Sequence, residues 1–168
     1  YVAQPTAIRR SVAFAKAVFD GQMSVEGVTA RLAPNVREAM GMVSRGEIPV
    51  LIDPEATLLG ELQPGYLIDA ILAKRNLGTR RGMAPVTVAL GPGFSAGDDC
   101  DAVIETNRGH HLGRVILEGP AQPNTGIPGE IAGHGALRVV RAPCAGVMRC
   151  HVRLGDVVEA GALLAHVG

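Results

Sequence analysis

The spacing of apolar residues predicts three helices in the first part of the chain. Over residues 6–19 the apolar side chains recur at intervals of three and four, and Gly21 supplies a natural stop. The same spacing predicts a helix over 36–45 that ends at Gly46. A third, shorter helix is expected over 55–62.

Between these helices the pattern predicts strands. Residues 23–32 alternate imperfectly between apolar and polar side chains, which indicates one strand. Residues 48–52 and 66–72 are nearly continuous apolar runs, typical of strands buried on both faces of a parallel sheet. Strand, helix and strand in this order indicate a βαβ unit, so the first third of the chain is expected to be α/β.

After Lys74 the pattern changes to short β-type runs separated by turns rich in Gly, Pro and Asn, with no helix between them. A further compact β unit is expected over 141–168. The predicted domains are an α/β part (1–82), a β-rich middle region (83–136) and a small β tail (137–168). The expected strands after Lys74 cover residues 85–90, 101–106, 112–117 and 137–141.

Composition narrows the function classes. Sixteen basic and sixteen acidic residues among 168 give no net charge, which argues against nucleic-acid and polybasic membrane partners. The longest uncharged run, 82–97, is interrupted by glycines and prolines, so no membrane helix is expected. Three cysteines without a C-x-x-C motif favour a reducing cytoplasm. Because the chain begins at Tyr1, we expect a fragment or a processed product.

A glycine loop follows the strand predicted at 85–90. Gly91, Gly93 and Ala96 fit G-x-G-x-x-A, the dinucleotide fingerprint, but that motif requires a helix N-terminus after the glycines. Here Asp98 and Asp99 follow, and then a strand. Two interpretations stay open: a plain connection between strands, or a loop that holds a ligand. The ligand interpretation uses Gly91, Gly93 and Ser95 for the ligand and Asp98 and Asp99 for a metal such as Mg²⁺.

Charged residues gather near the end of the run 66–72. Asp69 lies within the apolar run, and a carboxylate there requires partners. Lys74, Arg75 and Asn76 follow, at the sheet edge that faces ligands in open α/β sheets. The alternatives are a salt bridge at the strand end and a site for an anionic ligand.

The turn at 105–111 and the cysteines are weaker indications of a functional site. Glu105, Arg108 and His110 lie around one turn, which is either a polar turn or part of a ligand site. Two adjacent histidines on a strand would point to opposite faces, so His110 and His111 do not suit one metal ion. Cys144 and Cys150 are expected to be small buried thiols rather than metal ligands.

Six segments resemble, in order, the accessory protein family of the selenium-dependent molybdenum hydroxylase system. The resemblance implies a Rossmann-like part over 1–82, without the first strand and G-A-G-D-L-A-type loop of family members. It also implies a cytoplasmic protein whose partner is a xanthine dehydrogenase-type hydroxylase that it helps to mature. The resemblance does not identify a cofactor. The segments are AQPTAIRRSVAFAKAV (3–18), IPVLIDP (48–54), DAILAKRNLGT (69–79), GPGFSAGDDC (91–100), VIETNRGHHLGRVI (103–116) and NTGIPG (124–129).

The tail is similar to half of a biotinyl/lipoyl-like barrel-sandwich hybrid. The similarity lies in RAPCAGVM (141–148) and LGDVVEAGALLAHV (154–167). Carriers of this fold attach their prosthetic group to a lysine, and no lysine follows Lys74, so a structural or docking module is expected. Half a barrel leaves strand edges unpaired. We therefore expect a homo-oligomer or a chain that continues beyond these residues.

Three hypotheses follow. The first is an accessory protein that binds the hydroxylase or an anionic cofactor precursor. The second is a nucleotide- or redox-dependent enzyme acting on the molybdenum cofactor, and the third is a docking scaffold. An enzyme predicts that Asp69, Lys74 and the loop at Gly91 converge, whereas a scaffold predicts scattered, salt-bridged side chains.

Overall fold

The computed structural model describes residues 13–127, 129–153 and 155–168, and it contains mixed α/β secondary structure. The chain forms two compact units, Tyr1–Pro123 and Asn124–Gly168. The helix expected over 6–19 lies partly outside the described residues. Its final part is present as a 3₁₀ turn, η2 (Phe14–Lys16), that continues into α1 (Ala17–Asp20). This helix ends at Gly21, which adopts a left-handed φ of 78°.

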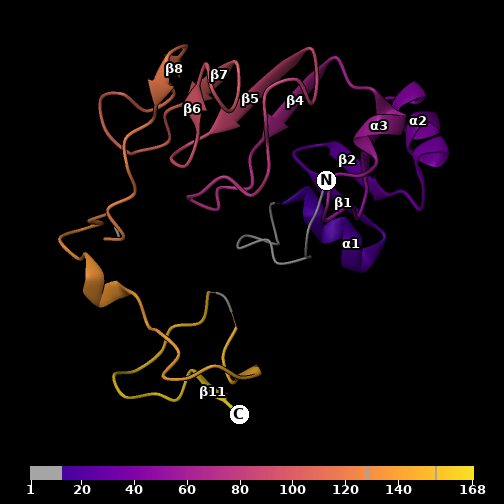
Figure 1. Ribbon diagram of the computed structural model, residues 1–168. Helices are drawn as coiled ribbons and strands as arrows, with labels where there is room; N and C mark the ends of the chain where they lie inside the picture. Colours follow the sequence, from indigo (N-terminus) through magenta and orange to yellow (C-terminus); the bar gives the residue numbers. More distant parts are fainter. Residues whose placement is uncertain (1–12, 128, 154) are drawn as a thin grey trace. The chain divides into compact units, whose positions relative to one another are not determined.

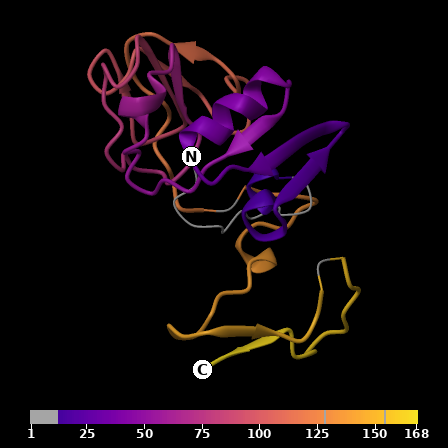
Figure 2. The same cartoon turned by 90° about the vertical axis from the view of Figure 1, so that its right-hand side faces the viewer.

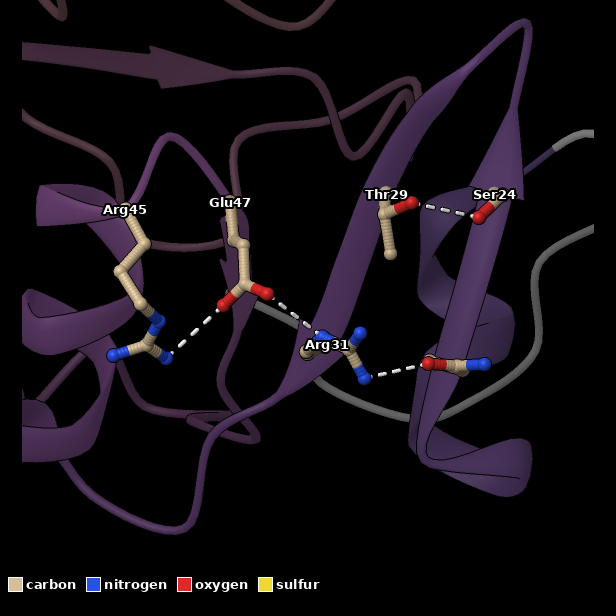
Figure 3. Close-up of polar contacts among 6 residues, drawn as sticks. Ser24, Thr29, Arg31, Arg45 and Glu47 are labelled. Atoms are coloured by element: carbon tan, nitrogen blue, oxygen red, sulfur yellow. Dashed lines mark hydrogen bonds and ion pairs between the residues drawn. The ribbon is translucent and has the colours of Figure 1, made fainter.

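The single strand expected over 23–32 is wrong, because the segment is a hairpin. Strands β1 (Gln22–Val25) and β2 (Val28–Leu32) pair antiparallel. Between them Glu26 and Gly27 both have positive φ, 50° and 83°, as a two-residue type I′ turn requires. The sequence signal is weak because Glu occupies the position that Asn or Asp usually takes. The hydroxyls of Ser24 and Thr29 bridge the two strands at 2.8 Å (Figure 3).

The hairpin leads into a βαβ unit. The predicted second helix is confirmed as α2 (Val36–Ser44), and the Asn35 side chain caps it by accepting a hydrogen bond from the Glu38 N–H at 2.9 Å. Strand β3 (Ile48–Val50) then pairs parallel with β2. Since the sheet order is β1-β2-β3, β3 lies at the edge and Ile48 is exposed. The prediction that this run is buried on both faces is therefore wrong.

Glu47 connects β2 to the end of α2 (Figure 3). Its carboxylate accepts hydrogen bonds from Arg31 Nε at 2.9 Å and from Arg45 Nη2 at 3.0 Å. The Arg31 hydrogen bond is the main cause of the lowered pKa of Glu47, and Arg45 adds to it against the opposing effect of burial. Arg31 also donates to Gln22 of β1, so one guanidinium on β2 connects β1 with the residue that precedes β3.

A second sheet, with four strands, also lies in the first unit (Figure 1). Its order is β4-β5-β7-β8; β4, β5 and β7 are mutually parallel, and β8 is antiparallel to β7. Because β3 and β4 lie in different sheets, the βαβ unit expected across 48–72 is wrong; β2, α2 and β3 form one instead. The bounds are β4 (Tyr66–Asp69), β5 (Val86–Leu90), β7 (Ala102–Ile104) and β8 (Val115–Ile116).

Three shorter features surround this sheet. Helix α3 (Leu59–Leu62) precedes β4 and is shorter than the predicted 55–62, because the Asp53 carboxylate binds the backbone of the residues before it. Strand β6 (Ser95–Ala96) pairs with β9 (Gly119–Pro120). The sequence predicts a domain boundary between residues 82 and 83. This position lies between β4 and β5, which pair with each other in the second sheet.

The two faces of the second sheet differ. One face packs Ala89 and Val103 against Phe94 and Cys100 in a buried cluster. The opposite face is apolar but more exposed; 74% of Tyr66 is exposed. The prediction that the run 66–72 is buried on both faces is wrong. We call this second surface the apolar sheet face, and it consists of Tyr66, Ile68, Val86, Val88, Leu90, Ala102, Ile104 and Val115.

The second unit is small and open. Strands β10 (Met148–Cys150) and β11 (Ala165–Val167) pair antiparallel, orange to yellow in Figure 2. The strand expected over 137–141 is wrong, since the 3₁₀ turn η3 (Ala136–Arg138) occupies that segment. None of the described side chains of this unit is buried. Cys144 and Cys150 are consequently exposed, against prediction, whereas Cys100 in the first unit is fully buried.

In the described part of the chain, every helix is too short or too polar to cross a membrane.

Candidate functional site

The carboxyl ends of the three parallel strands carry most of the residues that the sequence predicts for a site. Asp69 ends β4, Gly91 follows β5, and Glu105 follows β7. Because neighbouring parallel strands end at the same edge of a sheet, these positions lie along one edge, which we call the strand-end edge.

Asp69 organises the loop that leaves β4. Its side chain is buried; Oδ1 accepts a hydrogen bond from the Ile71 N–H at 3.0 Å, and Oδ2 accepts one from the Thr79 hydroxyl at 2.6 Å. Among the described residues it forms no ion pair, so the salt-bridge alternative is not what holds it. The carboxylate instead closes the loop 70–79 on itself.

Asn76 joins this loop to the glycine loop. Its Nδ2 donates to the Thr79 carbonyl at 2.7 Å and to Asp99 Oδ1 at 3.3 Å, while its Oδ1 accepts from the Gly78 N–H at 2.8 Å. The Asn76 side chain therefore fixes both loops. Asn76 is among the residues that the sequence predicts to bind a ligand. Its observed contacts are structural.

The two glycines allow the three loops to touch. A Cβ on Gly93, whose φ is +107°, would lie 2.5 Å from the Arg75 Cα. A Cβ on Gly91, whose φ is +81°, would lie 2.5 Å from Oγ1 of Thr106, just after β7. Only glycine fits either position, since both the backbone angle and the neighbouring atoms exclude a side chain. The loops after β4, β5 and β7 are therefore in contact.

Asp98 and Asp99 stabilise the end of the glycine loop. Asp99 Oδ2 accepts from the Ser95 N–H at 2.8 Å, and Asp98 Oδ2 accepts from the Ser95 hydroxyl at 3.1 Å. As expected, a strand rather than a helix follows these aspartates, because β7 begins at Ala102; the short strand β6 at Ser95 was not predicted. In the part of the chain that is described, no three His, Cys, Asp or Glu side chains cluster, so the metal site at Asp98 and Asp99 stays a prediction.

Glu105 is a buried carboxylate with backbone partners. It accepts hydrogen bonds from the N–H groups of Asn107 at 2.7 Å and Gln122 at 2.8 Å. Burial would raise the pKa of Glu105, but the hydrogen bonds from Gln122, Asn107 and Thr106 outweigh it and hold the pKa below its usual value. Asn107 also donates to the Gln122 side chain, so this carboxylate ties the turn after β7 to the segment after β9.

Arg108 and His110 lie in the exposed turn between β7 and β8. The His110 ring contacts the His111 ring edge-to-face, with centroids 5.1 Å apart. Within the described segments, no hydrogen bond or ion pair connects either residue to the loops at 70–79 or 91–99. The structure therefore connects Asp69, Arg75, Asn76, Gly91, Gly93, Ser95, Asp98 and Asp99, but not Arg108 and His110.

The basic side chains of the loop after β4 are exposed and differ in their pairing. Arg81 Nε pairs with Asp101 at 2.7 Å. Lys74, Arg75 and Arg80 form no ion pair with any residue that the structure describes. Lys74 also has a positive φ of 64°, a conformation unusual for a residue with a side chain. The carboxylates of the edge thus accept local hydrogen bonds, while these three cations extend into solvent.

Sequence reasoning missed a cavity of about 620 Å³ beside Asp69. Leu58, Leu62 and Leu67 supply part of its apolar lining, and the buried Asp53 lies at its wall. Burial would raise the pKa of Asp53, but hydrogen bonds from Leu58 and Thr57 lower it overall. The spacing from Asp53 to Thr57 is a local signal for this turn, whereas the cavity itself depends on tertiary packing.

The chain is similar to a longer bacterial protein. It is 64% identical over 167 residues to a protein of Escherichia coli K12 described as "Uncharacterized protein YqeB". The match covers 99% of this chain and 31% of that protein, so the chain spans about a third of the length of the curated relative it matches. No family model matches the chain, and no solved structure matches it.

Proposed function

We propose that this protein is a cytoplasmic accessory protein in the maturation of a selenium-dependent molybdenum hydroxylase, and that it binds an anionic cofactor precursor at the strand-end edge. The six segments described above support the pathway. Three of them, 69–79, 91–100 and 103–116, supply the loops that touch at this edge.

One observation carries the binding proposal, namely the packing of Arg75 on the glycine loop. Because Gly93 has no side chain, the Arg75 backbone lies directly against it. Arg75 is thereby anchored by its backbone beside this loop while its side chain is exposed, and Asp69, Asp99 and Glu105 already accept hydrogen bonds from their own chain. The charge left without an internal partner is positive.

This arrangement suits an oxyanion. A guanidinium donates two parallel hydrogen bonds to phosphate-like groups, and an ammonium supplies a compact positive charge. We assign the first role to Arg75 and the second to Lys74. Asp98 and Asp99 remain the proposed ligands of an accompanying Mg²⁺ ion.

Thermal-shift and calorimetric titrations with molybdate, phosphate, ATP and NAD(P), each with and without Mg²⁺, test the binding proposal. We expect stabilisation by at least one of the oxyanions, weakening as salt is added. Lys74→Ala/Arg75→Ala should lose it, and Arg37→Ala, which removes an exposed arginine from α2, should keep it. If no anion stabilises the protein, or if both variants respond alike, the proposal is wrong. A response confined to the nucleotides would favour the enzyme hypothesis.

The pathway is tested in cells. A strain without this protein should contain hydroxylase protein with reduced activity and molybdenum content, and the wild-type gene should restore both. The Lys74→Ala/Arg75→Ala variant should restore neither, although it accumulates normally. Full hydroxylase activity in the deletion strain would contradict the proposed role.

The apolar sheet face favours a second candidate, a docking surface for a second copy of this chain. Parallel sheets are ordinarily covered on both faces, and this face exposes 63% of Ile68 and 56% of Val115. Ile68→Asp should reduce the mass measured by light scattering to that of a monomer. Val157→Asp, at an exposed apolar residue of the second unit, should not. A monomeric wild-type chain would contradict this candidate.

We also propose a more specific fold for each of the two units. We infer that the part expected to be Rossmann-like, 1–82, contributes β4 to such an arrangement and that β5 and β7 of the predicted β-rich region continue it, an inference supported by the parallel order of these strands. We also infer that the tail belongs to half of a biotinyl/lipoyl-like barrel-sandwich hybrid. The β10–β11 pair and the turns at Gly155 and Gly161, both with positive φ, support this inference.

A further inference from the structure

Two histidines meet on the only strand pair described in the second unit. His151 directly follows β10 and His166 lies in β11; His151 Nε2 and His166 Nδ1 are 2.8 Å apart. Both rings are exposed, and their centroids are 5.0 Å apart. The contact could not be predicted from the sequence, because the two histidines belong to different strand segments fifteen residues apart.

The pairing register explains why the two rings meet. His166 lies opposite Arg149, and the His151 N–H donates to the Leu164 carbonyl. Since side chains alternate between the faces of a strand, Arg149, His151, Leu164 and His166 share one face. Cys150 lies on the opposite face and is therefore not a third ligand of the same ion.

We propose that His151 and His166 form a binding site for a divalent transition metal, with Cu²⁺ as the preferred ion and water in its remaining positions. Nitrogen ligands about 2.0 Å from a square-planar ion lie about 2.8 Å apart when adjacent, and about 3.3 Å apart around a tetrahedral ion. The observed 2.8 Å is the length of a hydrogen bond between the two rings, and it brings the two nitrogens to the spacing of adjacent ligands in the square-planar arrangement that Cu²⁺ favours, so that the rings need only to turn toward a shared ion.

Metal binding requires one change of tautomer. In the hydrogen-bonded pair, one of the two facing nitrogens carries the proton. That ring shifts its proton to its other nitrogen through water, so that both facing nitrogens present a lone pair to the ion. No net proton is released when two neutral rings bind the ion in this way.

The architecture of the second unit gives the ion a structural role. None of its described side chains is buried, and its cysteines are free thiols. Units without a buried hydrophobic core often depend on a structural metal or a disulfide. A metal that joins the residue after β10 to β11 would hold together the strand pair on which the unit depends. This inference does not rest on the proposed function.

Calorimetry and electron paramagnetic resonance of the whole 168-residue chain with Cu²⁺, in the presence of glycine as a weak competitor, test the site. We expect coupling to two imidazole nitrogens in the wild-type spectrum. His151→Ala and His166→Ala should each weaken binding at least tenfold, and His134→Ala, which removes another exposed histidine of this unit, should leave it unchanged. A spectrum without two nitrogen couplings overturns the proposal even if a variant fails to fold.

Two further variants distinguish this site from Cu²⁺ binding at another place on the chain. Because the Arg149 guanidinium shares the face of His166 and repels a cation, Arg149→Gln should tighten Cu²⁺ binding severalfold. Cys144→Ser/Cys150→Ser should retain the binding, since no thiol belongs to the site. Loss of binding in the double serine variant, or equal binding by the wild type and both single-histidine variants, would show that the ion binds elsewhere.

Discussion

At the scale of single residues, Gly93 determines how closely the loops of the strand-end edge approach. Gly93→Ala would place a Cβ 2.5 Å from the Arg75 backbone, where no flexible side chain is available to move away. We expect it to destabilise the protein by about 2 kcal/mol or more, as chemical denaturation would measure.

Gly97→Ala is the matched control for this change. Gly97 has a similar φ of +95°, but no atom lies within 4 Å of its Cβ position. It therefore measures the backbone strain alone, about 1 kcal/mol. Equal losses of unfolding free energy in the two variants would show that the contact of the added Cβ with Arg75 does not contribute to the destabilisation.

Glu105 illustrates how a buried carboxylate contributes to stability. Glu105→Gln replaces an oxygen that accepts backbone N–H groups by an amide that donates, which should cost about 1–3 kcal/mol at neutral pH. Because the folded-state pKa of Glu105 is lowered, its contribution is present above the ordinary Glu pKa of about 4.3. That contribution is lost as the pH falls through the folded-state value.

Urea denaturation of the wild type and Glu105→Gln across this range measures the effect. The difference in unfolding free energy between them should shrink as the solution becomes acidic. A difference that stays constant with pH would mean that the wild-type carboxylate has the same pKa in the folded and unfolded states.

At the scale of elements, the β1–β2 hairpin contains a turn residue that is not optimal. Glu26 has a φ of 50°, where Asn is tolerated better than Glu. We expect Glu26→Asn to stabilise the protein by up to about 1 kcal/mol in thermal or chemical denaturation. Glu26→Ala removes the same side chain without this conformational advantage, and should not stabilise it.

Element type was easier to predict from the sequence than pairing. The helix α2 was predictable because Asn35, the apolar spacing and Gly46 act within one segment. The strands β5 and β7 were also predictable from their residues. The hairpin turn was missed because Glu26 lacks the usual signature, and the partner of β4 was missed because pairing depends on distant segments.

At the scale of the whole molecule, the two units differ in how much side-chain surface they bury. The first unit contains fully buried side chains such as Val103 and Cys100, whereas the described side chains of the second are all at least partly exposed. Since slow amide exchange requires hydrogen bonds shielded by packing, we expect β5 and β7 to exchange slowly and β10 and β11 rapidly.

Hydrogen exchange followed by mass spectrometry checks this expectation. Peptides covering 86–104 should remain protected long after peptides covering 145–168 have exchanged. Equal protection of both segments in the absence of metal would show that the second unit is stabilised by more than the pairing of β10 with β11.

The sequence by itself determined the α/β character of the chain, the helix at 36–45, several short strands and the candidate residues that follow β4, β5 and β7. These features depend on local spacing, capping and turn residues. Tertiary structure decided that 48–52 and 66–72 belong to different sheets, that Asp69 binds Thr79 and that Arg75 lies on Gly93. It also brought His151 to His166. The physical reason is that register and loop contacts arise between segments distant in the chain, where local pattern carries no information.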